Sequence, residues 1–228
     1  MRVLLREYGL RVALGLVADR LLRRLSGNRC GLYWYRFYQQ AVSDQPLARE
    51  DPNLVYRWLA QHDPVLEQMP RPAANLRARF EQDVKCLVVM KQEELIACAW
   101  FGFGRFHEDE VNCIYRMPAD AVWDFDVYVV PRYRLGRTFA RTWQAANALL
   151  VKEGVAQSFS RISAYNPHSI RSHQRLGAVQ VGSALFLRLG ALQLMCSNLG
   201  PRVSLTLGSA RAPQLDFGRF VCAAVSRC

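Results

Sequence analysis

The residues that point most directly to chemistry lie in segment 126–140, which reads DVYVVPRYRLGRTFA. An apolar stretch stops at a proline, a short basic turn follows, and a helical pattern begins at once. The start of a helix exposes unpaired backbone N–H groups and the positive end of the helix dipole, so it binds phosphate. Arginines at positions 132, 134, 137 and 141 add positive charge there. The segment predicts a phosphate-binding turn; an ordinary strand-to-helix turn with solvated arginines is the alternative.

A second segment, 166–177, reads NPHSIRSHQRLG. Asn166 stands three residues before Ser169, and His173 stands four residues after it. In a helix, residues three and four apart are neighbours on one face. The pattern therefore predicts a short helix whose one face carries an amide, a hydroxyl and an imidazole.

Together the two segments resemble the signature segments of the GNAT superfamily of acyl-CoA-dependent N-acyltransferases. In that family, a strand with a bulge leads through a Pro-x-Tyr-Arg/Gln-x-x-Gly-x-Gly/Ala turn into a helix that binds the CoA pyrophosphate. The second signature, Asn-x-x-Ala/Ser followed by Tyr and Leu-Gly, matches at Asn166, Ser169, Leu176 and Gly177. The resemblance covers about residues 84–190. It implies an α/β fold with a mixed, largely antiparallel central sheet flanked by helices.

The resemblance implies acetyl-CoA or another acyl-CoA as co-substrate, and an amine of an unidentified acceptor as the second substrate. In the turn, Gly136 stands one position early, and Arg137 and Phe139 occupy positions where the family has small residues. Backbone N–H donation survives any side chain that tolerates helical angles, so phosphate binding is still expected. The implied cofactor-binding residues are Val127, Tyr128, Val129, Arg134, Leu135, Gly136, Arg137, Thr138, Phe139, Ala140, Asn166 and Ser169.

The implied reaction is direct transfer of the acyl group from CoA to the amine. The family's tyrosine, which often acts as general acid near the CoA sulfur, is replaced by His173. A histidine has an unperturbed pKa of about 6.5 and can protonate a leaving thiolate. A strand N–H near Val129 would hold the oxyanion of the tetrahedral intermediate.

The amine must lose a proton, so a base or an ordered water is needed. Asp126 is the candidate base and Asp124 the alternative; by strand alternation the two share one face. An acidic turn at 108–110 is expected to be solvated instead.

Hydrophobic periodicity predicts the elements that position these residues. A long helix is expected at 135–152 and a short one at 167–176. Asp51 and Pro52 predict the start of another short helix, followed by one at 73–82. Strands are expected at 32–38, 86–90, 95–101, 111–116, 122–130, 159–164 and 179–189, with a weaker signal at 203–207.

Residues 2–25 read as a basic amphipathic helix, with arginines at 2, 6, 11, 20, 23 and 24. Arginines follow its apolar centre where a signal peptide would have a cleavage site. Two interpretations stay open: the helix packs on the protein's own sheet, or it contacts an anionic membrane surface. The expected division is this helix at 1–28 and an acyltransferase domain at 29–228.

Composition sets the remaining bounds. The chain has 228 residues, 51% of them hydrophobic, which excludes a disordered protein. Its formal charge of +11 favours anionic partners, but no nucleic-acid reading motif is present, so no specific nucleic acid is expected. Seven cysteines without metal-ligand spacing predict small core residues in a reducing compartment and no metal. A cytoplasmic protein follows, with the inner face of the membrane as the alternative location.

Three functions remain as hypotheses. The leading one is an acyl-CoA-dependent N-acyltransferase. An enzyme of the same fold that transfers longer chains, such as an N-acyl amino acid synthase, is the second. A non-catalytic protein that kept the fold for ligand sensing or as a scaffold is the third, and the displaced glycine and absent tyrosine support it.

Overall fold

The computed structural model describes residues 2–208 and 211–220, and it divides into two compact units. Unit 1 comprises residues 1–39, 107–116 and 160–228, and unit 2 comprises residues 40–106 and 117–159. Strand β8 (Gln157–Ser163) begins in unit 2 and ends in unit 1. The predicted division at residue 28 stays a prediction.

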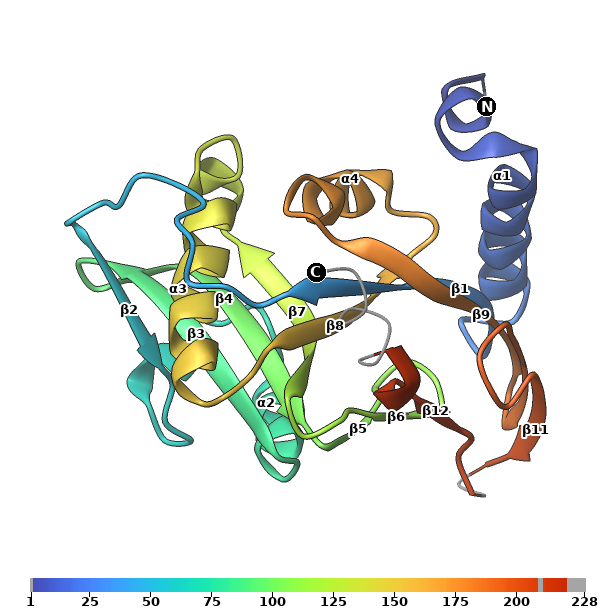
Figure 1. Ribbon diagram of the computed structural model, residues 1–228. Helices are drawn as coiled ribbons and strands as arrows, with labels where there is room; N and C mark the ends of the chain where they lie inside the picture. Colours follow the sequence, from blue (N-terminus) through green and yellow to red (C-terminus); the bar gives the residue numbers. More distant parts are fainter. Residues whose placement is uncertain (1, 209–210, 221–228) are drawn as a thin grey trace. The chain divides into compact units, whose positions relative to one another are not determined.

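Unit 2 is built on four antiparallel strands, hydrogen-bonded in the order β7-β4-β3-β2 (Figure 1). The 3-10 helices η1 (Pro64–Gln68) and η2 (Pro131–Tyr133) lie in connections between these elements. The strands and helices are β2 (Leu54–Trp58), α2 (Ala73–Phe80), β3 (Val84–Lys91), β4 (Glu94–Phe103), β7 (Ala121–Val129) and α3 (Thr138–Lys152).

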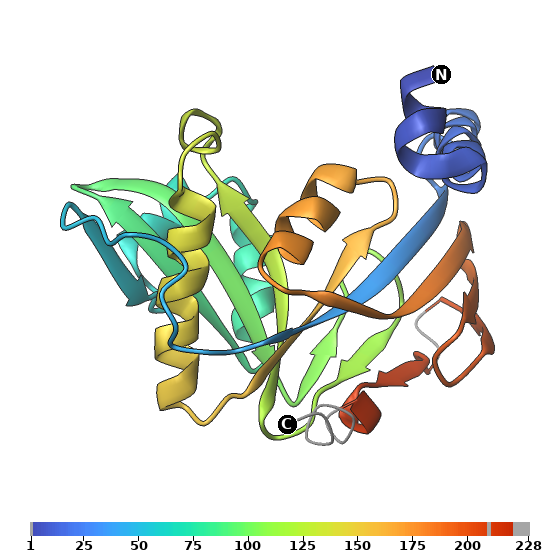
Figure 2. The same ribbon diagram turned by 45° about the horizontal axis from the view of Figure 1, so that its top comes forward.

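Helices α2 and α3 cover opposite faces of this sheet (Figures 1 and 2). Leu76 of α2 packs with Val88 and Trp100 on one face. On the other face, Phe139 of α3 packs against Val89 and its neighbours. Because successive strand residues point to opposite faces, strands buried on both sides read as continuous apolar runs. That is why the central strands were recognisable in the sequence.

Unit 1 contains four antiparallel strands in the order β11-β10-β9-β1. Helix α4 (Pro167–Arg175) packs through Ile170 against Tyr38 and Ile162. A small second sheet has the order β12-β6-β5, and its strand β5 begins in unit 2. The remaining elements are α1 (Arg2–Leu25), β1 (Cys30–Ala41), β5 (Arg105–His107), β6 (Ile114–Arg116), β9 (Val179–Leu189), β10 (Leu192–Ser197), β11 (Val203–Leu207), β12 (Gln214–Asp216) and η3 (Gly218–Phe220).

The fold is the predicted α/β class, with largely antiparallel strands flanked by helices. One predicted element is wrong: the short helix expected from Asp51 is strand β2, which pairs with β3 from Leu54↔Lys91 to Trp58↔Leu87. Val55, Tyr56 and Trp58 are strand-forming residue types, and sheet pairing outweighs the local capping signal. Strand β10 was not predicted at all.

Helix α1 extends over the predicted residues but is broken at Gly9, whose φ of 74° is not helical. The helix is attached to strand β1 of the same unit, since Asp19 accepts a hydrogen bond of 2.8 Å from the backbone N–H of Leu32. Within the described ranges, no helix is both long and apolar enough to cross a membrane.

Candidate functional site

Strand β7 carries a bulge at the candidate base. Its register with β4 shifts between the pairs Cys98↔Tyr128 and Trp100↔Phe125, so two residues of β7 oppose one of β4. Asp126, the first of the two, has a φ of 48°, in the left-handed region that non-glycine residues rarely adopt. The structure thus contains the strand bulge that the resemblance implied, and it re-aims the Asp126 side chain.

Two arginines hold the Asp126 carboxylate. Arg79 Nη1 donates to Oδ2 over 2.6 Å, and Arg71 donates to both carboxylate oxygens, with Nε 2.9 Å from Oδ2. The buried Arg79 guanidinium lies 5.1 Å from the ring centre of Trp100 and 5.2 Å from that of Phe125. Burial pushes the pKa of Asp126 upward, but the hydrogen bonds from Arg71 and Arg79 outweigh it, and the net pKa is lowered.

Asp124 and Asp126 do not share a face, contrary to the expectation from alternation. Asp124 pairs across the sheet with Phe101, whose ring contacts Trp143 of α3. It is buried, and its Oδ2 accepts a hydrogen bond of 2.6 Å from the Ser158 hydroxyl. Asp126 instead joins arginines on the α2 side of the sheet. The bulge that begins at Asp126 breaks the two-residue period on which the expectation rested.

The turn after β7 is exposed and leads directly into α3. Residues 134–137 are exposed, and Arg137 at the N-cap position of α3 makes no side-chain capping bond. The N–H groups of the first helical turn have no acceptor within the helix. A helix start without a side-chain cap, preceded by an exposed turn, can therefore donate hydrogen bonds to an anion.

The four arginines near this turn differ in their partners. Arg132 is paired with Glu94, and Arg141 donates to Asp51 over 3.0 Å. Arg134 donates through Nε to the Val129 carbonyl over 2.8 Å. No carboxylate of the described residues pairs with Arg134 or Arg137. The uncompensated positive charge at the start of α3 therefore comes from these two arginines.

The second predicted segment forms α4 in unit 1. Asn166 is its N-cap, with Oδ1 accepting the Ser169 N–H over 3.1 Å, and Pro167 occupies the first turn. His173 lies one turn after Ser169, with Nδ1 2.9 Å from the Ser169 carbonyl oxygen. The structure thus brings Asn166, Ser169 and His173 together on one helix, as predicted.

Burial of His173 favours the neutral form of its imidazole. It is 6% exposed, and burial lowers its pKa, although the bond to the Ser169 carbonyl opposes that shift. A carbonyl only accepts hydrogen bonds, so Nδ1 carries the proton and the neutral ring keeps its lone pair on Nε2. The ring must therefore first gain a proton at Nε2 before it can act as an acid.

The acidic turn at 108–110 was expected to be solvated, but one of its residues is buried. Glu108 is 7% exposed, and its two carboxylate oxygens accept hydrogen bonds of 2.7 and 2.8 Å from Arg161. Glu110 accepts a hydrogen bond of 2.8 Å from the Tyr35 hydroxyl. The arginine that allows Glu108 to be buried lies 53 residues away in the chain, so the turn sequence alone gave no sign of it.

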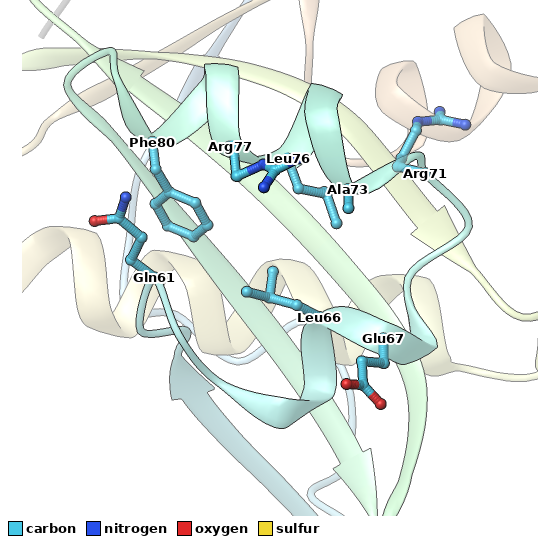
Figure 3. A pocket seen from close by; sticks show the side chains of 8 residues that line it. All are labelled: Gln61, Leu66, Glu67, Arg71, Ala73, Leu76, Arg77 and Phe80. Atoms are coloured by element: carbon cyan, nitrogen blue, oxygen red, sulfur yellow. The ribbon is translucent and has the colours of Figure 1, made fainter.

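A cavity of ≈ 410 Å³ lies between η1 and α2 (Figure 3). Leu66, Leu76 and Phe80 form its apolar wall, and Arg71, the exposed partner of Asp126, contributes to the rim. Sequence reasoning missed both this cavity and the two arginines on Asp126. Their separations of 47 and 55 residues from Asp126 leave no local signal.

The cysteines occupy the predicted core positions only in part. Cys86, Cys98 and Cys113 are buried thiols, whereas Cys30 is half-buried and Cys196 is exposed. Cys222 and Cys228 lie outside the described residues. Within the described part of the chain, no three side chains of His, Cys, Asp or Glu gather to hold a metal ion.

Comparisons with known proteins find similarity in structure. No family model and no curated protein sequence matches the chain. A conserved protein of unknown function from Staphylococcus epidermidis aligns with a TM-score of 0.52 and 10% identity, over 75% of this chain and 67% of its own. A putative GNAT-family acetyltransferase from Novosphingobium aromaticivorans aligns with a TM-score of 0.46 and 19% identity, over 68% of this chain and 62% of its own.

An aminoglycoside N-acetyltransferase solved in complex with CoA aligns with a TM-score of 0.41 and 18% identity, over 57% of this chain and 90% of its own. At these identities a likeness concerns the fold, and fold does not by itself specify function. What the chain shares with the Staphylococcus protein is its fold.

Proposed function

We propose that the chain is an N-acyltransferase that moves an acetyl or other acyl group from acyl-CoA to the amine of an acceptor. The proposal rests mainly on the structure of the segment that runs from β7 through the exposed turn to the start of α3. A bulged strand ends before Pro131, an exposed turn follows, and α3 starts without a side-chain cap beside Arg134 and Arg137. Anionic phosphates of CoA match those N–H donors and those two guanidinium groups.

In the proposed reaction, the amine nitrogen attacks the thioester carbonyl and a new C–N bond forms. The C–S bond then breaks, and the electron pair leaves on the CoA sulfur. The amine loses one proton, and the thiolate gains one. We assign the proton that the thiolate gains to His173. Its Nε2 would first take up that proton from solvent water and then deliver it to the sulfur, while the Ser169 carbonyl holds the ring through Nδ1. An N–H near Val129 remains the proposed oxyanion donor.

For the proton lost by the amine, we favour an ordered water over Asp126. A carboxylate with a lowered pKa is a weak base, and protonation of Asp126 would remove the anion that faces Arg71 and Arg79. Asp126→Asn separates the two cases: a water base predicts that kcat per folded molecule changes less than about tenfold, whereas a base role predicts a larger loss.

The direct test is transfer of labelled acetyl and long-chain acyl groups from CoA to a panel of primary amines. Amide formation with either donor supports the enzyme and fixes its acyl length. CoA binding without transfer to any amine would favour the non-catalytic ligand-sensing protein.

We also propose that α1 contacts an anionic membrane. Leu10, Leu14, Leu21 and Leu25 are between 54% and 84% exposed and recur at spacings of four and seven residues along one side of the helix. The exposed arginines 11, 20 and 24 flank them. The same helix is anchored to unit 1 through Asp19, so packing and membrane contact are compatible. This would place the protein at the inner face of the membrane, in a reducing compartment.

A further inference from the structure

One face of the unit 1 sheet is apolar and only partly buried. Strands β1, β9, β10 and β11 are in register, so that Leu32, Leu187, Leu194 and Leu205 form one row across the sheet. The rows on either side are also entirely apolar. The twelve residues of this outer face are Cys30, Leu32, Trp34, Leu185, Leu187, Leu189, Leu192, Leu194, Cys196, Val203, Leu205 and Leu207.

All twelve side chains are half-buried or exposed. Exposure is greatest on β11, where Val203, Leu205 and Leu207 are 65–66% exposed. The opposite face carries the core of unit 1, including Tyr35, Phe186 and Met195, which are 0–1% exposed. An antiparallel sheet with one packed face normally carries polar residues on the other. Here both faces are apolar, which marks the outer face as a binding surface.

The charged residues in and around these four strands indicate which kind of partner binds the outer face. None of the four strands contains an aspartate or a glutamate. Arg29 and Arg202 directly precede the first apolar residues of β1 and β11, and Arg36 is the next outward residue after Trp34. In a symmetric pair of copies, a rim of arginines would face the same rim, and like charges facing one another are destabilising. An anionic lipid surface matches both the apolar centre and the cationic rim.

We infer that this outer face of β1-β9-β10-β11 lies on the surface of an anionic lipid bilayer. Strand β11 has no neighbour on its outer side among the described residues, so its edge leaves backbone N–H and C=O groups to be solvated. Such groups are not tolerated in the hydrocarbon core. The face therefore rests in the headgroup layer, with the leucine and valine side chains reaching toward the acyl chains.

The surface is separate from the proposed acyl transfer. It adds an attachment in unit 1 besides the exposed leucines of α1, and it uses none of the residues assigned to CoA. Membrane attachment by two weak features is stronger than by either alone, because the second contact forms within an already bound molecule.

The experiment is co-sedimentation of the full-length protein with vesicles. One vesicle set contains phosphatidylcholine alone, and the other contains phosphatidylcholine with phosphatidylglycerol. The test variant is Val203→Thr/Leu205→Thr/Leu207→Thr, which keeps strand-forming residues at exposed positions. Val55→Thr is the matched control, since Val55 is 54% exposed on β2 of unit 2. We expect the triple variant to partition about tenfold less to anionic vesicles, and the control to partition like wild type.

A second readout locates the contact. Cys196 is exposed on the outer face, so anionic vesicles should slow its alkylation, which peptide mass spectrometry measures at that residue. A separate Leu14→Ser/Leu21→Ser variant measures the contribution of α1 alone. The triple variant should bind CoA as tightly as the wild-type protein does. Wild-type vesicle binding by the triple variant with unprotected Cys196 would overturn the inference. So would a stable dimer in light scattering that the triple variant abolishes, because the face would then belong to a second copy.

Discussion

Arg79 donates a hydrogen bond of 2.6 Å to the carboxylate of Asp126, and the pair joins α2 to the bulge of β7. Side-chain exposure is 6% for the arginine and 14% for the aspartate. The left-handed backbone of Asp126 is thus held in place by a nearly buried ion pair. This contact fixes the strand at the point where it turns toward Pro131 and the start of α3.

The two arginines on Asp126 should contribute unequally to stability. Arg79→Ala leaves a mostly buried carboxylate with one partner, and we expect it to lower the free energy of unfolding by about 3 kcal/mol. Arg71 has a side chain that is 40% exposed, so Arg71→Ala should cost under about 1 kcal/mol. Urea denaturation of the two variants measures both values. Equal losses would show that burial does not set the strength of these pairs.

Stability should fall as the pH drops below the ordinary histidine pKa of 6.5, because of His173. Burial lowers its pKa in the folded protein, so the unfolded chain binds the proton first as the pH falls. The native state is favoured in full above pH 6.5 and progressively less down to the lowered folded pKa. Thermal melting between pH 8 and pH 5 measures this slope. His173→Gln should flatten it, whereas His168→Gln, at an exposed position of the same helix, should leave it unchanged.

CoA affinity should depend on two of the four arginines near α3. Arg134→Ala and Arg137→Ala each remove a guanidinium that no described carboxylate neutralises, and we expect each to weaken CoA binding about tenfold. Arg132→Ala is the control, since Arg132 is already paired with Glu94. Calorimetric titration gives the three dissociation constants. Equal affinity in all three variants would place the pyrophosphate elsewhere.

His173→Ala should lower kcat at least tenfold, since a positioned general acid contributes about 10²–10⁴-fold. The dissociation constant for CoA should stay nearly unchanged. His173→Tyr should retain more activity than the alanine variant, because a phenol can also donate a proton to the thiolate. Steady-state kinetics with the true acceptor amine provides the comparison. A wild-type kcat in His173→Ala would mean that the thiolate leaves unassisted or is protonated by water.

Local patterns predicted the elements with strong periodicity or clear stop signals. Helix α3, strand β7 before Pro131, and the short helix α4 after Asn166 were all predicted from a few adjacent residues. Contacts between distant segments were not. The pairing of Arg71 and Arg79 with Asp126, the burial of Glu108 by Arg161, and the recruitment of 54–58 into a strand all depend on residues far apart in the chain. The bulge at Asp126 reversed the expected side-chain direction because one inserted residue changes the face of its neighbours.

We propose that acyl-CoA binds at the start of α3, and thermal melting with added acetyl-CoA is the sharpest test of this site. A ligand that binds only the folded state raises the melting temperature with concentration. We expect such a rise in the wild-type protein, a smaller rise in Arg137→Ala and the full rise in Arg132→Ala. An unchanged melting temperature at millimolar acetyl-CoA would contradict it.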